Sequence, residues 1–299
     1  MPVSRLGELA ALGTSVSWTC SALFFSAAGR RIGSLATNIL RLGFAVIFLS
    51  LATLVLRGHL LPHDASAFTW RWLALSGFVG LVFGDLCQFR AFVVLGPRLT
   101  LLVVSLAPLF TAALGRVVLG EVLSLQQLAG MAVTIAGIAL ALTAHRNTVR
   151  SAAEGHWSWR GALLALGGAV GQAGALVLSK YGMRGYDPMA STQIRVIAAL
   201  ACFLVGFTIA GLWPRVVAGL RHSGGLRYTA LGALFGPVIG VTLSLVAVVH
   251  APAGVAASLM ALAPLLILPV SAWRGEHVGW GGLAGAVLAV AGVALLVTG

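Results

Sequence analysis

Long apolar runs separated by short polar connections fill the chain from one end to the other. A helix needs about 20 mostly apolar residues to cross a bilayer, and ten runs reach this length. They cover residues 7–29, 35–57, 70–93, 98–119, 124–144, 159–182, 190–213, 226–249, 254–273 and 277–298. The longest polar stretch, His145 to Arg160, separates two sets of five. The pattern predicts an all-α membrane protein with a first five-helix unit at 1–144, a linker at 145–158 and a second unit at 159–299.

The two units carry the same sequence pattern. In the first copy the pattern reads Ala107-Pro108-Leu109, Gly120-Glu121, Gly130 and Gly137, and in the second it reads Ala263-Pro264-Leu265, Gly275-Glu276, Gly285 and Gly292. The offset is 264 − 108 = 156 at the proline and 276 − 121 = 155 at the glutamate, so the copies form an internal repeat. Because each copy has an odd number of spans, the second enters the membrane from the opposite side. Such inverted repeats typically place a substrate site near the midplane and expose it to each side in turn.

Composition agrees with this class of protein. The chain is 59% hydrophobic and 9% charged, with a mean hydropathy of +1.01, which excludes a soluble domain. The net charge of +12 comes from basic residues scattered singly between apolar runs, so nucleic acid is not an expected partner. Three widely spaced cysteines suggest neither disulfides nor a metal site, and no catalytic motif is present. We expect no enzyme activity and no cofactor. The expected partners are lipid and a small-molecule substrate, and the expected state is a monomer or weak homo-oligomer.

Charged residues inside the spans are the first functional candidates, because burying them in a bilayer is costly. Asp85 lies about 12 Å deep in the third span and Arg41 about 9 Å deep in the second, measured from the same surface. We expect an ion pair that serves either helix packing or substrate and proton sensing. At the equivalent repeat positions stand Arg195 and Val241, so Arg195 has no acidic partner in its own repeat. It either binds a substrate carboxylate, or it snorkels toward the surface or binds backbone carbonyls.

Other polar and aromatic residues near the middle of the spans are candidates for lining a cavity. Trp18 and Gln172 are equivalent by the repeat (172 − 18 = 154), as are Gln88 and Ser244 (244 − 88 = 156). Gln88 and Phe89 share a helix face with Asp85. Further candidates surround the two helix-bending prolines, either as lining or as hinges: Ser105 and Pro108 in the first unit, and Met260 and Pro264 in the second. Glu121 and Glu276 are expected to cap the next helix or to pair with Arg116 and Arg274.

This arrangement of ten spans, with Ala-Pro-Leu, Gly-Glu and two glycines closing each half, resembles the EamA-type branch of the drug/metabolite transporter superfamily. The resemblance covers essentially the whole chain. It implies a drug/metabolite transporter fold, in which helices one to four and six to nine surround a central cavity while 124–144 and 277–298 lie outside. It implies export of amino acids or other small metabolites, and the layout is similar to YddG-type exporters of aromatic and other neutral amino acids. The glutamate that small multidrug-resistance relatives carry within the first helix is missing, since Glu8 stands at its start.

The orientation has two opposing indications. Six Arg and Lys residues fall on the side of the termini and ten on the other, which favours termini outside. The resemblance implies that both termini lie in the cytoplasm, in a bacterial-type inner membrane.

We therefore expect a secondary transporter that exports small metabolites, amino acids first, by alternating access. Drugs, sugar phosphates or nucleotide sugars are the alternative substrates. An intramembrane enzyme or lipid-handling protein is the alternative class.

Overall fold

We describe a computed structural model of the chain, which covers residues 5–144, 158–263, 265–266 and 280–298. These residues form helices and turns and include no strand. The first half contains α1 (Leu6–Ile32), α2 (Ser34–Arg57), α3 (Ala67–Gly77), η1 (Phe78–Gly84), α4 (Asp85–Val104), α5 (Ala107–Leu114), η2 (Gly115–Leu119) and α6 (Leu125–Ala144). The second half contains α7 (Trp159–Met183), α8 (Pro188–Ile209), α9 (Trp213–Leu220), α10 (Ser223–Ala233), η4 (Leu234–Gly240), α11 (Val241–His250), α12 (Ala253–Met260) and α14 (Trp280–Thr298).

Nine stretches of the described residues are long and apolar enough to cross a membrane, in agreement with the all-α membrane fold expected from the sequence. The expected ninth span, 254–273, begins with α12 and then continues outside the described residues, as does the expected linker up to residue 157. Two details differ from the prediction. The connection expected at 94–97 is helical, because α4 continues to Val104. A short helix, α9, also follows the seventh span, and Pro214 lies in its first turn, where proline is well tolerated.

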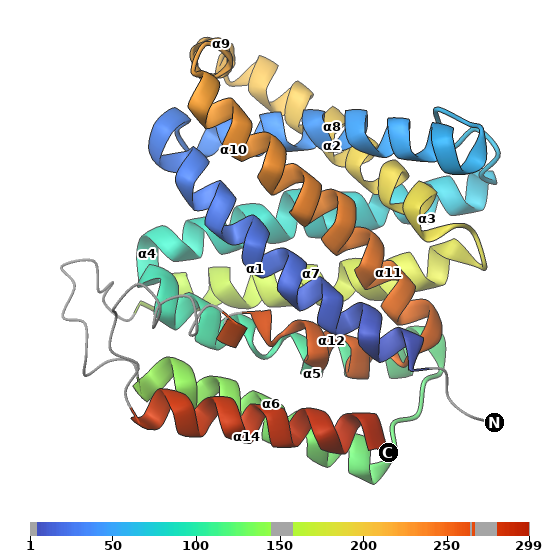
Figure 1. Ribbon diagram of the computed structural model, residues 1–299, viewed down its shortest axis with the longest axis vertical. Coiled ribbons are helices and arrows are strands. Elements are labelled where there is room, and N and C mark those ends of the chain that lie inside the picture. Colours follow the sequence, from blue (N-terminus) through green and yellow to red (C-terminus); the bar gives the residue numbers. More distant parts are fainter. Residues whose placement is uncertain (1–4, 145–157, 264, 267–279, 299) are drawn as a thin grey trace.

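The long helices run back and forth between two sides of the molecule (Figure 1). In Figure 1, α1 begins and α14 ends on the right side of the view, together with the connections 58–66 and 184–187. We call this side the termini face. The other side, where α2 begins and where α9 lies, is called the opposite face. The connections 120–124 and 251–252 belong to the termini face as well.

The inverted repeat is visible in the backbone. The π-helical turns η1 and η4 occupy equivalent positions, 78–84 and 234–240, at an offset of 156. At the same offset, both proline-bearing helices break before the proline. Leu106 N donates to Val103 O (3.1 Å), and Leu262 N donates to Leu259 O (3.3 Å). Residue-by-residue equivalence therefore extends to irregular backbone features, which apolar composition alone does not require.

Close glycine contacts hold helices of different repeats together. An ideal Cβ on Gly84 would lie 3.2 Å from its own turn and 3.5 Å from the α7 backbone, and one on Gly171 would lie 2.7 Å from Gly84 Cα. In the other half, a Cβ on Gly240 would lie 2.6 Å from the Trp18 ring, and one on Gly236 would lie 2.4 Å from Ser21 Oγ. Each π-helical turn thus packs against the first helix of the other repeat. GxxxG patterns serve such close approaches in bilayers.

The fifth and last helices, α6 and α14, pack on each other at the edge of the molecule (Figure 1). Their glycines lie at the crossing, where a Cβ on Gly137 would lie 2.7 Å from Gly285 O and one on Gly130 would lie 2.9 Å from Gly292 O. These are the glycines that recur seven residues apart in each copy. Their peripheral place agrees with what the resemblance implied.

Candidate functional site

Asp85 and Arg41 form the expected ion pair. Asp85 is the first residue of α4, directly after the π-helical turn η1, and Arg41 lies on α2. Arg41 Nη2 donates to Asp85 Oδ2. The Arg41 side chain is 12% exposed and the Asp85 side chain is 19% exposed. π-Helical turns are rare and are often found at functional sites, because the wider turn redirects the residues that follow it. Here the turn places the carboxylate of Asp85 beside a guanidinium.

Arg195 lies on α8 and is 5% exposed. The Arg195 backbone contacts the end of α3, the helix that precedes η1. An ideal Cβ on Gly77 would lie 2.3 Å from Arg195 O. Among the described residues, the Arg195 Nε and Nη1 atoms have no hydrogen-bond partner, and neither has Arg41 Nε. Asp85 interacts electrostatically with both arginines. Asp85 is therefore paired with Arg41 and lies within electrostatic reach of Arg195, which has no ion-pair partner among the described residues, and N–H groups remain available for an anion.

Polar and aromatic groups adjoin this charged cluster. A Gln172 side-chain N–H on α7 donates to the side-chain oxygen of Gln88 on α4. The Arg41 guanidinium lies 5.8 Å from the ring centre of Phe89 and 5.6 Å from that of Phe25. The structure thus brings together the predicted residues of α2, α4, α7 and α8. Phe25 was not predicted, because it lies near the end of the first span, where an aromatic residue gives no signal of depth.

Several predicted lining residues lie elsewhere. Trp18 packs against Gly240, and Ser244 Oγ donates to Val241 O in its own helix (2.6 Å). Ser105 Oγ donates to Leu102 O (2.7 Å), and Met260 is the last residue of α12 and is 3% exposed. Nothing connects these four side chains directly to the charged cluster in the described structure.

Of the two predicted helix-bending prolines, Pro108 lies in the first turn of α5, just after the break at Ser105 and Leu106. This position removes no helical hydrogen bond. Pro264 and Glu276 lie outside the described residues. The proposed roles of these residues therefore stay predictions.

The partner expected for Glu121 is wrong. Its carboxylate pairs with Lys180 Nζ at 2.6 Å rather than with Arg116, and it accepts a hydrogen bond from Ala253 N at 2.8 Å. Glu121 therefore caps α12, not the helix that follows it in sequence. Lys180 also donates to Ala251 O at 2.8 Å. The Glu121–Lys180 pair joins residues far apart in sequence, and the spacing of the Gly-Glu motif gives no indication of it.

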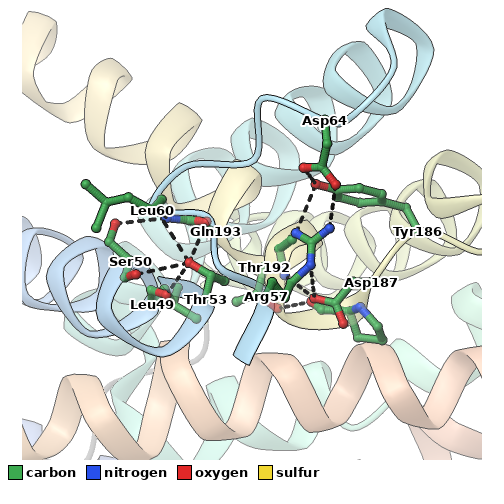
Figure 2. Close-up of polar contacts among 12 residues, drawn as sticks. Leu49, Ser50, Thr53, Arg57, Leu60, Asp64, Tyr186, Asp187, Thr192 and Gln193 are labelled. Atoms are coloured by element: carbon green, nitrogen blue, oxygen red, sulfur yellow. Dashed lines mark hydrogen bonds and ion pairs between the residues drawn. The ribbon is translucent and has the colours of Figure 1, made fainter. Parts of the chain in front are cut away.

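A second polar cluster was missed altogether. Arg57, Asp64, Tyr186 and Asp187 meet at the termini face, where the connection after α2 lies against the connection before α8 (Figure 2). The chain has only seven acidic residues, so the presence of two in these connections was the available signal.

Two hollows of the described surface lie on other helices, one on α14 around Trp280 and one on α3 around Phe68. No group of three or more His, Cys, Asp or Glu that could hold a metal occurs among the residues described.

Comparisons with known proteins give one family and one fold. The sequence pattern of the EamA-like transporter family matches residues 5–143 and 159–298. A solved structure described only as "Crystal structure of protein" is similar in fold, with a TM-score of 0.74 and 20% sequence identity over 97% of this chain and 95% of its own. No curated protein matches the sequence. The two matched segments coincide with the two sets of five expected spans.

Proposed function

Because this chain belongs to the EamA-like transporter family, a family of membrane transporters of small metabolites, we propose that it exports metabolites that carry a carboxylate, amino acids first. The observation that carries this proposal is the charge balance of the cluster. Asp85 is paired with Arg41 and interacts only electrostatically with Arg195, whose Nε and Nη1 have no hydrogen-bond partner among the described residues.

A substrate carboxylate would complete this cluster. An unneutralised charge within a bilayer is costly, and guanidinium groups bind carboxylates through charge-assisted hydrogen bonds. The paired amides of Gln88 and Gln172 offer further donors and acceptors, and the rings of Phe89 and Phe25 offer an apolar wall. An amphiphilic molecule with one anionic end and a neutral or aromatic body fits these groups best.

The repeat supports alternating access as the mechanism. Each π-helical turn packs through glycine against the first helix of the other repeat, so two equivalent helix pairs surround the cluster. Inverted repeats can exchange their conformations, which opens the site to one face and then to the other. Small residues at these crossings allow the helices to tilt without steric clash.

Counterflow in proteoliposomes tests the proposal. Vesicles loaded with an unlabelled neutral amino acid should accumulate the labelled form, and the matched amide and decarboxylated amine should not compete. Arg195→Gln should raise the half-saturating concentration about tenfold or more, as expected for a lost hydrogen bond to a charged group. Arg227→Gln, which changes an exposed arginine of α10, is the control for charge alone. Equal exchange of the amine would refute the anion site, and exchange of a sugar phosphate instead would retain the site and replace the substrate class.

A further inference from the structure

The polar cluster of Arg57, Asp64, Tyr186 and Asp187, which we call the face lock, joins the two repeats at the termini face. Arg57 Nη2 lies 2.5 Å from Asp64 Oδ2, and Arg57 Nη1 donates to Tyr186 Oη at 3.2 Å. Tyr186 Oη donates to Asp64 Oδ1 at 2.7 Å, which closes a ring of three side chains. Arg57 Nε lies 3.9 Å from Asp187 Oδ1. Figure 2 shows Arg57 between the Asp64–Tyr186 pair and Asp187.

Buried hydrogen bonds next to the face lock hold the same two segments together. Gln193 is fully buried on α8, and its side-chain amide donates to Ser50 Oγ (2.9 Å) and to Leu60 O (2.8 Å). Thr53 Oγ1 lies 3.4 Å from Gln193 Oε1 (Figure 2). The end of α2 and the connection that follows it are therefore fixed to the start of α8.

A second inter-repeat contact lies at the same face. Lys180 of the second repeat pairs with Glu121 of the first, and together they bind the start of α12 through Ala253 N and Ala251 O. We call Lys180 and Glu121 the clasp. Both the face lock and the clasp must separate if the charged cluster is to open toward the termini face.

Among the described residues, no ion pair at the opposite face matches the face lock or the clasp, and the counterpart of Glu121, Glu276, lies outside these residues. At the offset of 154, Tyr186 corresponds to Ile32, Asp187 to Gly33, Lys180 to Ser26 and Arg57 to Gly211. Asp64 corresponds to an apolar residue between 218 and 220 at any offset from 154 to 156. The symmetry that should make the two access states equal is broken at these positions.

The burial of equivalent residues also differs between the two repeats. Leu245 and Val248 of α11 are fully buried, whereas their counterparts in α4 are Phe89, 42% exposed, and Phe92, partly exposed. All residues of α12 are buried, whereas its described counterparts 99–104 are mostly partly exposed. Among the described residues, α11 and α12 are therefore packed more tightly than their counterparts in the first repeat.

We propose that the face lock and the clasp hold the resting protein closed at the termini face, so that the charged cluster faces the opposite side before substrate arrives. This inference rests on the alternating access proposed above. Contacts formed in one of two states stabilise that state alone. Among the described residues no ion pair joins the repeats at the opposite face, so no equivalent charged contact in that part of the chain stabilises the other state.

Cysteine labelling tests the lock without any substrate. Ser191 lies on α8 one turn from both Asp187 and Arg195, is fully buried, and its Oγ has no partner among the described residues. Ser191→Cys, in a chain whose three native cysteines are replaced, is therefore a reporter below the lock that costs no hydrogen bond. Phe89→Cys is the reporter on the more exposed side.

Tyr186→Phe keeps the ring and removes the shared hydroxyl, and Lys180→Met breaks the clasp. Each should speed maleimide labelling of Ser191→Cys about fivefold to thirtyfold and slow that of Phe89→Cys. Arg71→Gln, at an exposed arginine of the same face, is the control and should change neither rate. Unchanged labelling at Ser191→Cys would overturn the proposal. Faster labelling of both reporters would also overturn it, because the contacts would then serve folding and not a choice between states. Reciprocal labelling with failed counterflow would refute the substrate proposal alone.

Discussion

Removing the carboxylate of Asp85 should reverse the energetic role of Arg195. In the wild-type protein Asp85 is paired with Arg41 and also interacts electrostatically with Arg195, and the Asp85 and Arg41 side chains are 19% and 12% exposed. Asp85→Asn leaves both guanidiniums in the bilayer interior without a counter-charge. We therefore expect Arg195→Gln to be less destabilising, or even stabilising, in the Asp85→Asn background.

The magnitude follows from the low exposure of the pair. Removing one partner of a buried ion pair costs about 3–5 kcal/mol, mainly because the other charge stays behind. Asp85→Asn strands two cations, so its cost should lie toward the upper end. Arg41→Gln should cost less, because Asp85 retains the field of Arg195. The coupling between Asp85→Asn and Arg195→Gln should be about 0.5–3 kcal/mol, the range for residues of one charge network.

The assay is a double-mutant cycle on the purified protein. Tryptophan fluorescence during unfolding in mixed detergent gives the free energy of unfolding for the wild type, both single variants and the double variant. The same cycle with Arg41→Gln compares the paired arginine with the unpaired one. An equal cost of Arg195→Gln in both backgrounds would refute the shared carboxylate, and a larger cost for Arg41→Gln than for Asp85→Asn would contradict the charge balance.

Three further outcomes are expected. Val241→Asp gives the second repeat the carboxylate it lacks, so it should neutralise the buried arginine of α8 and weaken amino-acid counterflow about tenfold or more. Gly137→Ala places a Cβ 2.3 Å from the backbone of α14 and should cost about 1–3 kcal/mol in thermal unfolding, whereas Gly43→Ala meets no atom within 4 Å and should be neutral. A hydrogen bond from Tyr186, then Arg57, lowers the pKa of Asp64. The contribution of the Asp64 carboxylate to stability should therefore be constant above about pH 5 and fall below about pH 4. It is measured as the difference in Tm between the wild type and Asp64→Asn at each pH.

Most of the fold could be predicted, because the apolar runs and the repeated motifs can be read directly from the sequence. The lengths of the apolar runs give the helices, the offset of 154 to 156 gives the repeat, and the odd number of spans in each copy predicts its inversion. The Arg41–Asp85 pair could be predicted as well, since the two residues stand at similar depths on neighbouring spans. Charged residues are rare enough in these spans that equal depth was sufficient evidence.

Contacts between distant connections could not be predicted in the same way. Glu121 was assigned partners near it in sequence, and the true partner, Lys180, comes from a helix of the other repeat. The Tyr186–Asp64 contact joins two connections whose sequences carry no shared motif. Such contacts depend on how the repeats cross, which the offset of the copies does not specify.

The residues that break the repeat are the ones with the strongest functional claims. A perfectly symmetric inverted repeat has two access states of equal energy and a site that is the same from both sides. Asp85 has a valine counterpart, Arg57, Tyr186, Asp187 and Lys180 have glycine, isoleucine, glycine and serine counterparts, and Glu121 alone keeps a glutamate counterpart in Glu276. On the proposed function, the first asymmetry leaves one arginine for a substrate anion, and on the further proposal the second favours closure at the termini face. If both proposals hold, symmetry supplies the movement between states, and these departures determine what is bound and where the site faces at rest.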